Sequence, residues 1–399
     1  MIGSLPPAKG VSPYTRQLVQ ALGARDDIDL QVIAFKSIYP RWAYPGGDPS
    51  EDGPAPAWLS QPRVRSIVTW WNPLSWVRAG FAIDGDVVHA QWWTHVLAPM
   101  YLVMLGIARL RGKRIVVTAH NVTPHESNVF TRFLARTVLR FGQRFIVHSP
   151  QNRSSLSLML RKSNGNTTVL PHGVLDAPRT GLTREQARAA LDLPADAPVV
   201  LAFGNIRPYK GTDVLLRSFA GIVATHPDAM LVIAGKPWWK WDPSPLIEEL
   251  GIGANVRTAL DFVPAADVES FFVAADVVAL PYTSFEAQSG VGALALPFGR
   301  ALVVSDVGGL PDLTDDPRTI VPPSNVSALA HAIARILDDA ELQRRLEERS
   351  LAIAARLDWD AIAEDTVAVY RSLVPLPEAA EIAASQPFEE PVSAGARQL

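Results

Sequence analysis

Apolar residues along this chain form short continuous runs that alternate with longer stretches in which they recur every three or four positions. Runs of this kind predict strands buried on both faces, and the longer stretches predict amphipathic helices. The predicted strands are 30–35, 86–91, 114–118, 145–147, 198–203, 231–234, 255–262, 277–280 and 301–304. The predicted helices are 14–22, 96–109, 130–141, 183–190, 268–275, 326–337, 340–356 and 359–373. Strand–helix alternation predicts two similar-sized α/β halves with parallel sheets.

Composition narrows the class of protein. The 399 residues include no cysteine, which excludes disulfides, thiolate metal sites and cysteine nucleophiles. The uncharged run 96–108 contains Pro99 and Gly106 and is too short to span a bilayer. Because no signal peptide precedes it, the sequence predicts a cytoplasmic protein. The segment 375–399, rich in Pro, Ala and Glu, has little periodicity and is predicted to be a disordered tail.

The small net charge of −3 hides an asymmetry between the two halves. Residues 1–170 hold 19 Lys and Arg against 9 Asp and Glu, whereas the rest hold 18 against 31. A basic first half predicts an anionic surface or substrate there, with membrane lipid or nucleic acid as the candidates. The sequence contains no recognisable module that reads nucleic acid, so we expect no nucleic-acid partner.

The segment after strand 277–280 contains the chemistry that most strongly suggests a ligand. Glu286 lies on the loop, and Ser289 and Gly290 open a helix whose first N–H groups have no intrahelical acceptor. Helix N-termini bind anions, and a carboxylate orients hydroxyl groups. A nucleotide sugar is a polyol at one end and a phosphate at the other. The alternative is an ordinary strand–loop–helix unit with an exposed glutamate.

A second loop carries two cations at the start of a helix. Strand 198–203 runs into Gly204-Asn205-Ile206-Arg207-Pro208-Tyr209-Lys210-Gly211. A pyrophosphate needs compensating charge, which Arg207 and Lys210 can supply. The alternative is a solvated basic turn.

Histidines and aromatic residues follow the predicted strands of the first half. His120 ends strand 114–118, and His125 and Glu126 follow as candidates for an acceptor pocket, with a structural role as the alternative. A metal site is disfavoured because the histidines lack i, i+4 spacing on one helix. Trp92 and Trp93 belong to a cluster of tryptophans that could stack on acceptor sugars, unless they pack in the core.

Helix 130–141 places Arg132, Arg136 and Arg140 at intervals of four. Basic amphipathic helices lie on anionic membrane surfaces, and we weigh this against a solvated arginine face on a core-packing helix.

Together these motifs resemble the retaining family-four glycosyltransferases, also called glycosyl transferases group 1. Glu286 matches the first glutamate of the family's Glu-x7-Glu motif, whereas the second falls on Leu294, which is a departure. Lys210-Gly211 matches the phosphate motif, but Asn205 stands where the family has an arginine, and Arg207 is the candidate substitute.

The resemblance also extends to the first half. Gly10 lies in the matching glycine loop, although the strand before it is nearly absent, so Met1 could be a late start. His120 matches the histidine that contacts the transferred sugar.

The resemblance implies the GT-B fold, in which two Rossmann-like domains face each other across a cleft. It implies an acceptor-side domain at 1–174, a donor domain at 175–357 and a helix at 358–374 that crosses back, followed by the tail 375–399. Donor binding would involve Gly10, Gly204, Asn205, Ser289, Gly290, Val291 and Leu294.

The implied reaction moves a sugar, with retention, from a nucleoside diphosphate sugar to a glycan or lipid-linked acceptor. Cell-envelope or exopolysaccharide synthesis is the implied setting, and a hexose the implied kind of sugar. Lys210, Arg207 and the helix N–H groups would stabilise charge on the diphosphate, Glu286 would orient sugar hydroxyls and His120 would contact the sugar's far side. The resemblance implies no metal and no other cofactor.

Three other outcomes stay open at this point. Leu294 and Asn205 favour a catalytically weak sugar-nucleotide-binding or scaffold protein. A nucleotide-sugar epimerase of the same fold would need extra carboxylate bases, which the sequence does not show. The basic half also suits a cytoplasmic protein bound peripherally to the inner face of the membrane.

Overall fold

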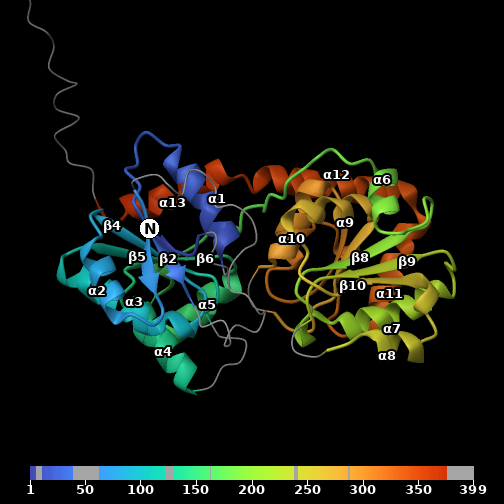
Figure 1. Ribbon diagram of the computed structural model, residues 1–399, viewed down its shortest axis with the longest axis horizontal. Helices are drawn as coiled ribbons and strands as arrows, with labels where there is room; N and C mark the ends of the chain where they lie inside the picture. Colours follow the sequence, from blue (N-terminus) through green and yellow to red (C-terminus); the bar gives the residue numbers. More distant parts are fainter. Residues whose placement is uncertain are drawn as a thin grey trace, which may run out of the picture.

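The structure is a computed structural model that describes residues 1–5, 11–38, 63–122, 129–161, 163–237, 241–285 and 288–374. In these residues the chain forms two parallel sheets, each covered by helices on both faces, which lie side by side along the long axis (Figure 1). The predicted tail 375–399 lies outside the described residues.

The first sheet has the strand order β3-β2-β1-β4-β5-β6-β7. Its strands are β1 (Ile2–Gly3), β2 (Val32–Ser37), β3 (Val64–Thr69), β4 (Val87–Trp92), β5 (Arg114–Ala119), β6 (Arg144–Val147) and β7 (Thr167–Val169). Its helices are α1 (Ser12–Gly23), α2 (Pro73–Phe81), α3 (Ala98–Leu110), α4 (Val129–Leu139) and α5 (Pro150–Leu160). The predicted weak first strand is only two residues long, yet it pairs with β2 on one side and β4 on the other.

The second sheet has the order β10-β9-β8-β11-β12-β13. Its strands are β8 (Val199–Phe203), β9 (Met230–Ala234), β10 (Val256–Ala259), β11 (Val277–Leu280), β12 (Ala301–Ser305) and β13 (Ile320–Val321). Its helices are α6 (Arg184–Ala190), α7 (Thr212–Val223), α8 (Ser244–Glu249), α9 (Val268–Ala274), α10 (Gly290–Ala295), α11 (Val326–Asp338) and α12 (Ala340–Arg356). Each face of this sheet has its own hydrophobic core. Helices α6, α9 and α10 contribute to the core on one face, and α7, α8 and α11 contribute to the core on the other.

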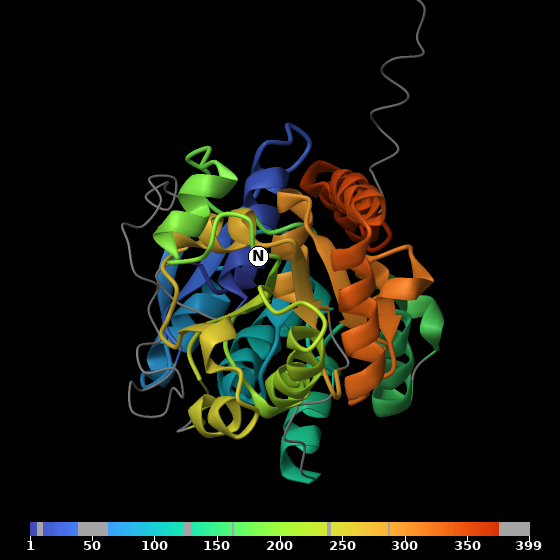
Figure 2. The same ribbon diagram turned by 90° about the vertical axis from the view of Figure 1, so that its right-hand side faces the viewer.

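Two segments connect the halves. Residues 170–176 lead from β7 toward the second sheet, and α13 (Trp359–Arg371) returns to pack against α1 (Figure 1). The two segments meet where the Trp359 indole N–H donates to Val174 O at 2.7 Å. A β-carbon on Gly173 would lie 2.4 Å from the same indole, so only glycine lets the linker approach it this closely. The view along the long axis shows α13 and α12 following one another on the same side of the molecule (Figure 2).

Candidate functional site

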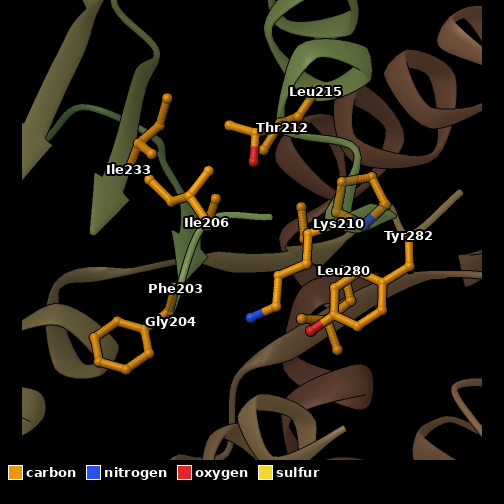
Figure 3. A pocket seen from close by; sticks show the side chains of 12 residues that line it. Phe203, Gly204, Ile206, Lys210, Thr212, Leu215, Ile233, Leu280 and Tyr282 are labelled. Atoms are coloured by element: carbon orange, nitrogen blue, oxygen red, sulfur yellow. The ribbon is translucent and has the colours of Figure 1, made fainter. Parts of the chain in front are cut away.

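The candidate site lies at the point where the strand order of the second sheet reverses. Strands β8 and β11 are neighbours there, and ligands of doubly wound sheets bind beyond the carboxyl ends of such a pair. The turn that follows β8 and the Pro281-Tyr282 turn that follows β11 line one pocket (Figure 3). The loop after β8 carries Arg207 and Lys210, the two cations that the sequence analysis proposed for phosphate binding.

Gly204 brings three segments of the site together. Its φ is +87°, and a β-carbon on it would lie 2.8 Å from Val291 Cγ2 and 3.2 Å from Lys210 Nζ. The turn after β8, the η5 turn (Pro208–Lys210) and the first turn of α10 therefore meet at this glycine. Behind it, Gly235 has a φ of +138°, and a β-carbon there would lie 2.4 Å from Gly204 O. The backbone approaches so closely only because both residues lack side chains.

Lys210 extends its amine toward Gly204, beside the ring of Tyr282 (Figure 3). The Nζ atom lies 5.6 Å from the centroid of that ring. Burial, and secondarily the charge of Arg207, lower the pKa of Lys210 to about 7. The pocket lining contains no carboxylate among the residues that the structure describes. An anion that entered here would supply the negative charge that the lysine lacks.

The η5 turn is held against the end of β11. Thr283 N–H donates to Tyr209 O at 2.7 Å, and a β-carbon on Gly211, whose φ is +65°, would lie 2.1 Å from Pro281 O. Tyr209 also stacks on Phe285, with ring centroids 5.8 Å apart. These contacts fix the position of Lys210 relative to the loop after β11.

Ser289 caps α10, as its sequence position predicts. Its Oγ accepts from the Gly292 N–H at 3.3 Å and lies 3.0 Å from Tyr282 Oη. The N–H groups of Gly290 and Val291 have no acceptor within the helix, because the first turn of any helix leaves them unpaired. Further along α10, half-buried Leu294 packs against the core of the second domain. Asn205, in contrast, is exposed.

His120 follows β5 in the first domain and is 6% exposed. Its Nε2 lies 2.8 Å from Gln91 Oε1, and its Nδ1 lies 3.3 Å from His148 Nε2. Both ring nitrogens are therefore engaged by side chains of the same domain. Sequence reasoning missed Gln91 and His148 as partners of His120, although each belongs to or follows a predicted strand, which was the available signal.

Four predicted site residues, Gly10, Glu286, His125 and Glu126, lie outside the described residues. The structure therefore gives no geometry for the carboxylate that would orient the donor sugar.

The two tryptophans proposed for the acceptor side have different environments. Trp92 is only 2% exposed and packs in the core of the first domain, so it has no surface for an acceptor sugar, and that assignment is corrected to a core role. Trp93 is half-buried beside Phe35, with ring centroids 6.0 Å apart, and its acceptor role stays a prediction.

The linker between the domains contacts α10 and the residues just before it. His172 N–H donates to Gln288 Oε1 at 3.0 Å, and Leu175 N–H donates to Ala293 O at 3.1 Å. From the other side, Gln17 of α1 donates to Asp176 Oδ2 at 2.7 Å. The donor-side helix and the first domain are thus tied together by residues of the linker.

No cluster of three or more histidine, aspartate or glutamate side chains in the described part of the chain could hold a metal ion. No helix in the described ranges is both long enough and apolar enough to cross a bilayer.

Comparison with known sequences gives a family for each half. Residues 8–176 match the model described as Glycosyltransferase Family 4, and residues 183–352 match that described as Glycosyl transferases group 1. The D-inositol 3-phosphate glycosyltransferase of Mycobacterium leprae is 35% identical over 58% of this chain and 55% of its own length. Its Corynebacterium urealyticum counterpart is 32% identical over 50% of this chain. The chain thus spans about half the length of these relatives, 55% and 49%.

Solved structures have the same fold at low sequence identity. Anabaena Alr3699/HepE in complex with UDP superposes with a TM-score of 0.71 at 18% identity, covering 94% of this chain and 99% of that one. Sucrose-phosphate synthase from Thermosynechococcus elongatus gives 0.69 at 21% identity, with 96% and 99% covered. With both halves matched in order and two parallel-sheet domains side by side, the chain belongs to the family-four glycosyltransferases and has the GT-B fold.

Proposed function

We propose that this protein is a retaining glycosyltransferase that moves a sugar from a nucleoside diphosphate sugar to a glycan or lipid-linked acceptor. The observation that carries the proposal is the convergence of Gly204, Lys210 and Val291 at the switch point of the second sheet. A close-approach glycine, a buried amine and the start of a helix are the features that a diphosphate requires. The structural neighbour Anabaena Alr3699/HepE was solved with UDP and with UDP-glucose, which supports the same ligand class here.

The chemistry of such a site is the stabilisation of charge that develops on the leaving diphosphate. Lys210 would supply a full charge once an anion raises its pKa, and Arg207 three positions earlier would supply a second. The N–H groups at the start of α10 would add preorganised dipoles. None of these groups needs a metal ion to act.

Retention is the finer part of the proposal. In the mechanism that the family resemblance implies, retention needs no nucleophile from the protein. Transfer on the same face of the sugar, guided by the leaving phosphate, places the catalytic demand on the diphosphate end. Arg207 and Lys210 lie where they could stabilise the negative charge that develops on the diphosphate.

The acceptor is proposed to be anionic. The first half carries 19 basic against 9 acidic residues, which favours approach of a phosphorylated acceptor. The names of the relatives specify D-inositol 3-phosphate, and a lipid-linked glycan phosphate has the same charge sign. Both belong in an acceptor screen, with cell-envelope or exopolysaccharide synthesis as the proposed setting.

Helix α4 supports contact with an anionic membrane surface. Val129, Phe130 and Phe133 are 88%, 66% and 63% exposed. Arg132 is exposed on the same helix, and Arg140 is exposed directly after its end. Exposed apolar side chains beside arginines suit the boundary between lipid headgroups and acyl chains. The helix protrudes at the lower edge of the first domain (Figure 1). Peripheral association on the inner face of the membrane is therefore part of the proposal.

A screen followed by a turnover assay tests the proposal. Thermal shift with a panel of nucleoside diphosphate sugars should identify the donor, because a ligand that binds the folded state raises the melting temperature by mass action. Radiolabelled donor is then incubated with inositol phosphate and lipid-linked acceptors, and the anomeric configuration of the product is read by NMR. Inversion at the anomeric carbon would exclude the retaining mechanism.

A sugar-nucleotide-binding protein without turnover is the second candidate. Two observations favour it, since Leu294 cannot accept a hydrogen bond from a ribose and Asn205 offers no charge where the family has an arginine. The same assay separates the two, because this candidate binds donor without releasing nucleoside diphosphate in the presence of any acceptor.

A further inference from the structure

Helix α2 exposes an apolar stripe at helical spacing. Leu74, Val77 and Phe81 recur at intervals of three and four, and the first and last are 78% and 61% exposed. Trp71, just before the helix, is 64% exposed. Of the thirteen large apolar side chains that are exposed among the described residues, five lie on α2 or in the three residues before it, whereas the second domain has two. Apolar surface gathered in this way marks a contact with lipid or with another molecule.

The stripe faces outward because another side of α2 is already packed. Ala79 and Gly80 are buried, and a β-carbon on Gly80 would lie 2.9 Å from Ile107 Cδ1 of α3. On a helix these two small residues lie on a different side from Leu74 and Phe81. Helix α2 therefore turns its small residues toward the core and leaves its large apolar side chains exposed.

An open cavity lies beside the start of the stripe. Its volume of about 420 Å³ falls within the range of roughly 300–1,000 Å³ that is typical of ligand pockets. The ends of β2 and β3 and the first turns of α2 form it, with a lining that includes Lys36, Ser66, Thr69, Trp71, Leu74 and Arg78. Leu74 thus belongs both to the cavity and to the stripe.

Hydrogen bonds fix the wall of the cavity that α2 contributes. The Asn72 side chain caps the helix and accepts from the Leu74 N–H at 3.1 Å. Ser75 Oγ donates to Asn72 O at 2.6 Å, and the Trp76 indole N–H donates to Thr69 O at 2.7 Å. The start of α2 is therefore anchored to the end of β3.

Two cations face the cavity. Lys36 and Arg78 line it, and no carboxylate does so among the residues that the structure describes. Neither cation has a hydrogen-bond or ion-pair partner in the described ranges. Both charges are therefore available to an anion, to which Arg78 also offers a planar fork of donors and Ser66 a hydroxyl.

A cationic cavity that shares a residue with an apolar stripe suits a ligand with an anionic head and an apolar remainder. A soluble sugar phosphate would use the cavity alone, and an apolar protein partner would use the stripe alone. An anionic lipid uses both, with its phosphate near Lys36 and Arg78 and its acyl chains along the stripe. Trp71, which lines the cavity, has the amphipathic ring that is enriched at membrane interfaces.

Helix α2 also lies in the same layer as α4. Helix α3 contacts both, and all three contribute to one core, so they cover the same face of the first sheet (Figure 1). The α2 stripe and the exposed Phe130 and Phe133 of α4 are therefore carried by the two neighbours of a single helix.

We propose that the cavity at the start of α2 binds the phosphate headgroup of an anionic membrane lipid, with the α2 stripe against the acyl chains. This inference rests on the proposed function only in taking a bilayer as the surface that α4 meets. It adds a site for an individual headgroup, and it orients the first domain with α2 and α4 both toward the membrane.

The absence of cysteine allows one position at a time to be measured on the full chain. Leu74→Cys introduces a single thiol, which is labelled with an environment-sensitive fluorophore. With vesicles of phosphatidylcholine and phosphatidylglycerol in equal parts, we expect emission to rise about twofold and to shift to shorter wavelength as the label leaves water. Leu351→Cys, 50% exposed on α12 of the second domain, is the matched control and should not respond. Unchanged emission at position 74 would overturn the proposal.

Charge removal tests the cavity separately from the stripe. Lys36→Gln and Arg78→Gln should each lower the affinity for these vesicles about fivefold, the effect of one basic residue near an anionic surface. Arg356→Gln, an exposed arginine of the second domain, is the control. Melting curves report whether each variant folds. Folded cavity variants that bind as Arg356→Gln does, or equal binding of the wild type to pure phosphatidylcholine, would remove the headgroup from the cavity.

A monomeric lipid distinguishes a headgroup site from general attraction to a charged surface. Dihexanoyl phosphatidylglycerol below its critical micelle concentration should change the emission of labelled Leu74→Cys saturably, and this response should be lost when Lys36 and Arg78 are also changed to Gln. A response to inorganic phosphate but not to the lipid would make the cavity a soluble-anion site and overturn the proposal. These readouts need no transfer of sugar, so a protein without transferase activity that gives them would contradict the proposed function and support this inference.

Discussion

A β-carbon added to Gly204 would lie 2.8 Å from Val291 Cγ2, although the two residues belong to different strand–loop–helix units. The absence of a side chain at Gly204 therefore allows the turn after β8 to lie close to the first turn of α10. The φ of Gly204, +87°, falls in the region that side chains other than glycine rarely adopt. The same added β-carbon would lie 3.2 Å from Lys210 Nζ, so a side chain at this position would also crowd the amine.

Gly204→Ala should therefore weaken both stability and ligand binding. Backbone strain and the collision with Val291 should cost about 1–3 kcal/mol of unfolding free energy, and nucleoside diphosphate affinity should fall with it. Gly221→Ala is the control, because a β-carbon there meets nothing within 4 Å and its helical position favours alanine. Chemical denaturation and calorimetric titration with UDP give the two values. Unchanged UDP affinity in Gly204→Ala would separate this glycine from the ligand site.

Removal of the pocket amine should impair transfer far more than it impairs folding. Lys210→Ala is expected to cost about 2–4 kcal/mol of transition-state stabilisation, or roughly 30- to 1000-fold in kcat/KM. Arg207→Ala should cost nearly as much if Arg207 replaces the charge that Asn205 lacks. Arg217→Ala, which breaks only an exposed pair with Glu249, is the control. If Arg207→Ala behaves like Arg217→Ala while Lys210→Ala is inactive, Arg207 does not contact the diphosphate.

The lowered pKa of Lys210 predicts that donor binding takes up a proton. With a pKa of about 7 in the free protein, about one tenth of the amine is charged at pH 8. A bound diphosphate raises that pKa, so binding at pH 8 should take up close to one proton, and affinity should decrease as pH rises above 7. Calorimetric titration of UDP in two buffers of different ionisation enthalpy measures the uptake. Lys210→Arg stays charged and should show none; equal uptake in both proteins would assign the proton to another group.

Leu294 tests whether the donor ribose lies where the family motif places it. A carboxylate at this position could accept hydrogen bonds from ribose hydroxyls, worth roughly 1–3 kcal/mol for a charged acceptor. Leu294→Glu should therefore lower the donor KM more than it changes kcat. Because Leu294 packs against the second-domain core, Leu294→Ala measures the loss of packing alone. Weaker donor binding in a folded Leu294→Glu protein would show that the ribose lies elsewhere.

Charge reversal on α4 tests the proposed membrane contact. Arg132, Arg136 and Arg140 changed together to Glu should release the protein from vesicles of anionic lipid, since each basic residue near such a surface contributes about 1 kcal/mol. Co-sedimentation at low salt, compared with neutral vesicles, provides the measurement. Phe133→Ser should weaken binding to a smaller extent, because its ring is 63% exposed and available for burial in lipid. Sedimentation that is the same for the triple variant and the wild type would make these arginines ordinary surface charge.

Local pattern was sufficient for most of the elements. Strands such as Val277–Leu280 are buried on both faces of a parallel sheet, so their apolar runs appear without interruption in the sequence. Helices such as Ala340–Arg356 bury one stripe and are visible by their spacing. Strand β3 was missed because it is the edge strand and carries the exposed residues Arg65 and Ser66, so its pattern is not that of a buried strand.

The loops that carry the proposed donor-side groups could also be located from the sequence, because their residue types are those that a phosphate ligand would need. Lys210, Gly204 and Ser289 were identified from the cations, the glycine and the cap that a diphosphate needs. Their convergence was not, since it depends on which strands are neighbours: β8 and β11 are adjacent in the sheet although 73 residues separate the end of one from the start of the other.

A group of hydrogen-bonded side chains in the first domain is the clearest case of a feature that only the tertiary structure decided. His89, Gln91, His120 and His148 come from three strands, each with an unremarkable polar residue in or after an apolar run. Parallel pairing of β4, β5 and β6 brings them together. His148 also bonds to Leu170 O of the linker, and His89 bonds to Tyr370 Oη of α13. Sequence alone could place each residue in or after a strand, but not which side chains face one another. That is a property of contacts between segments far apart in the chain, and only the folded molecule brings them into contact.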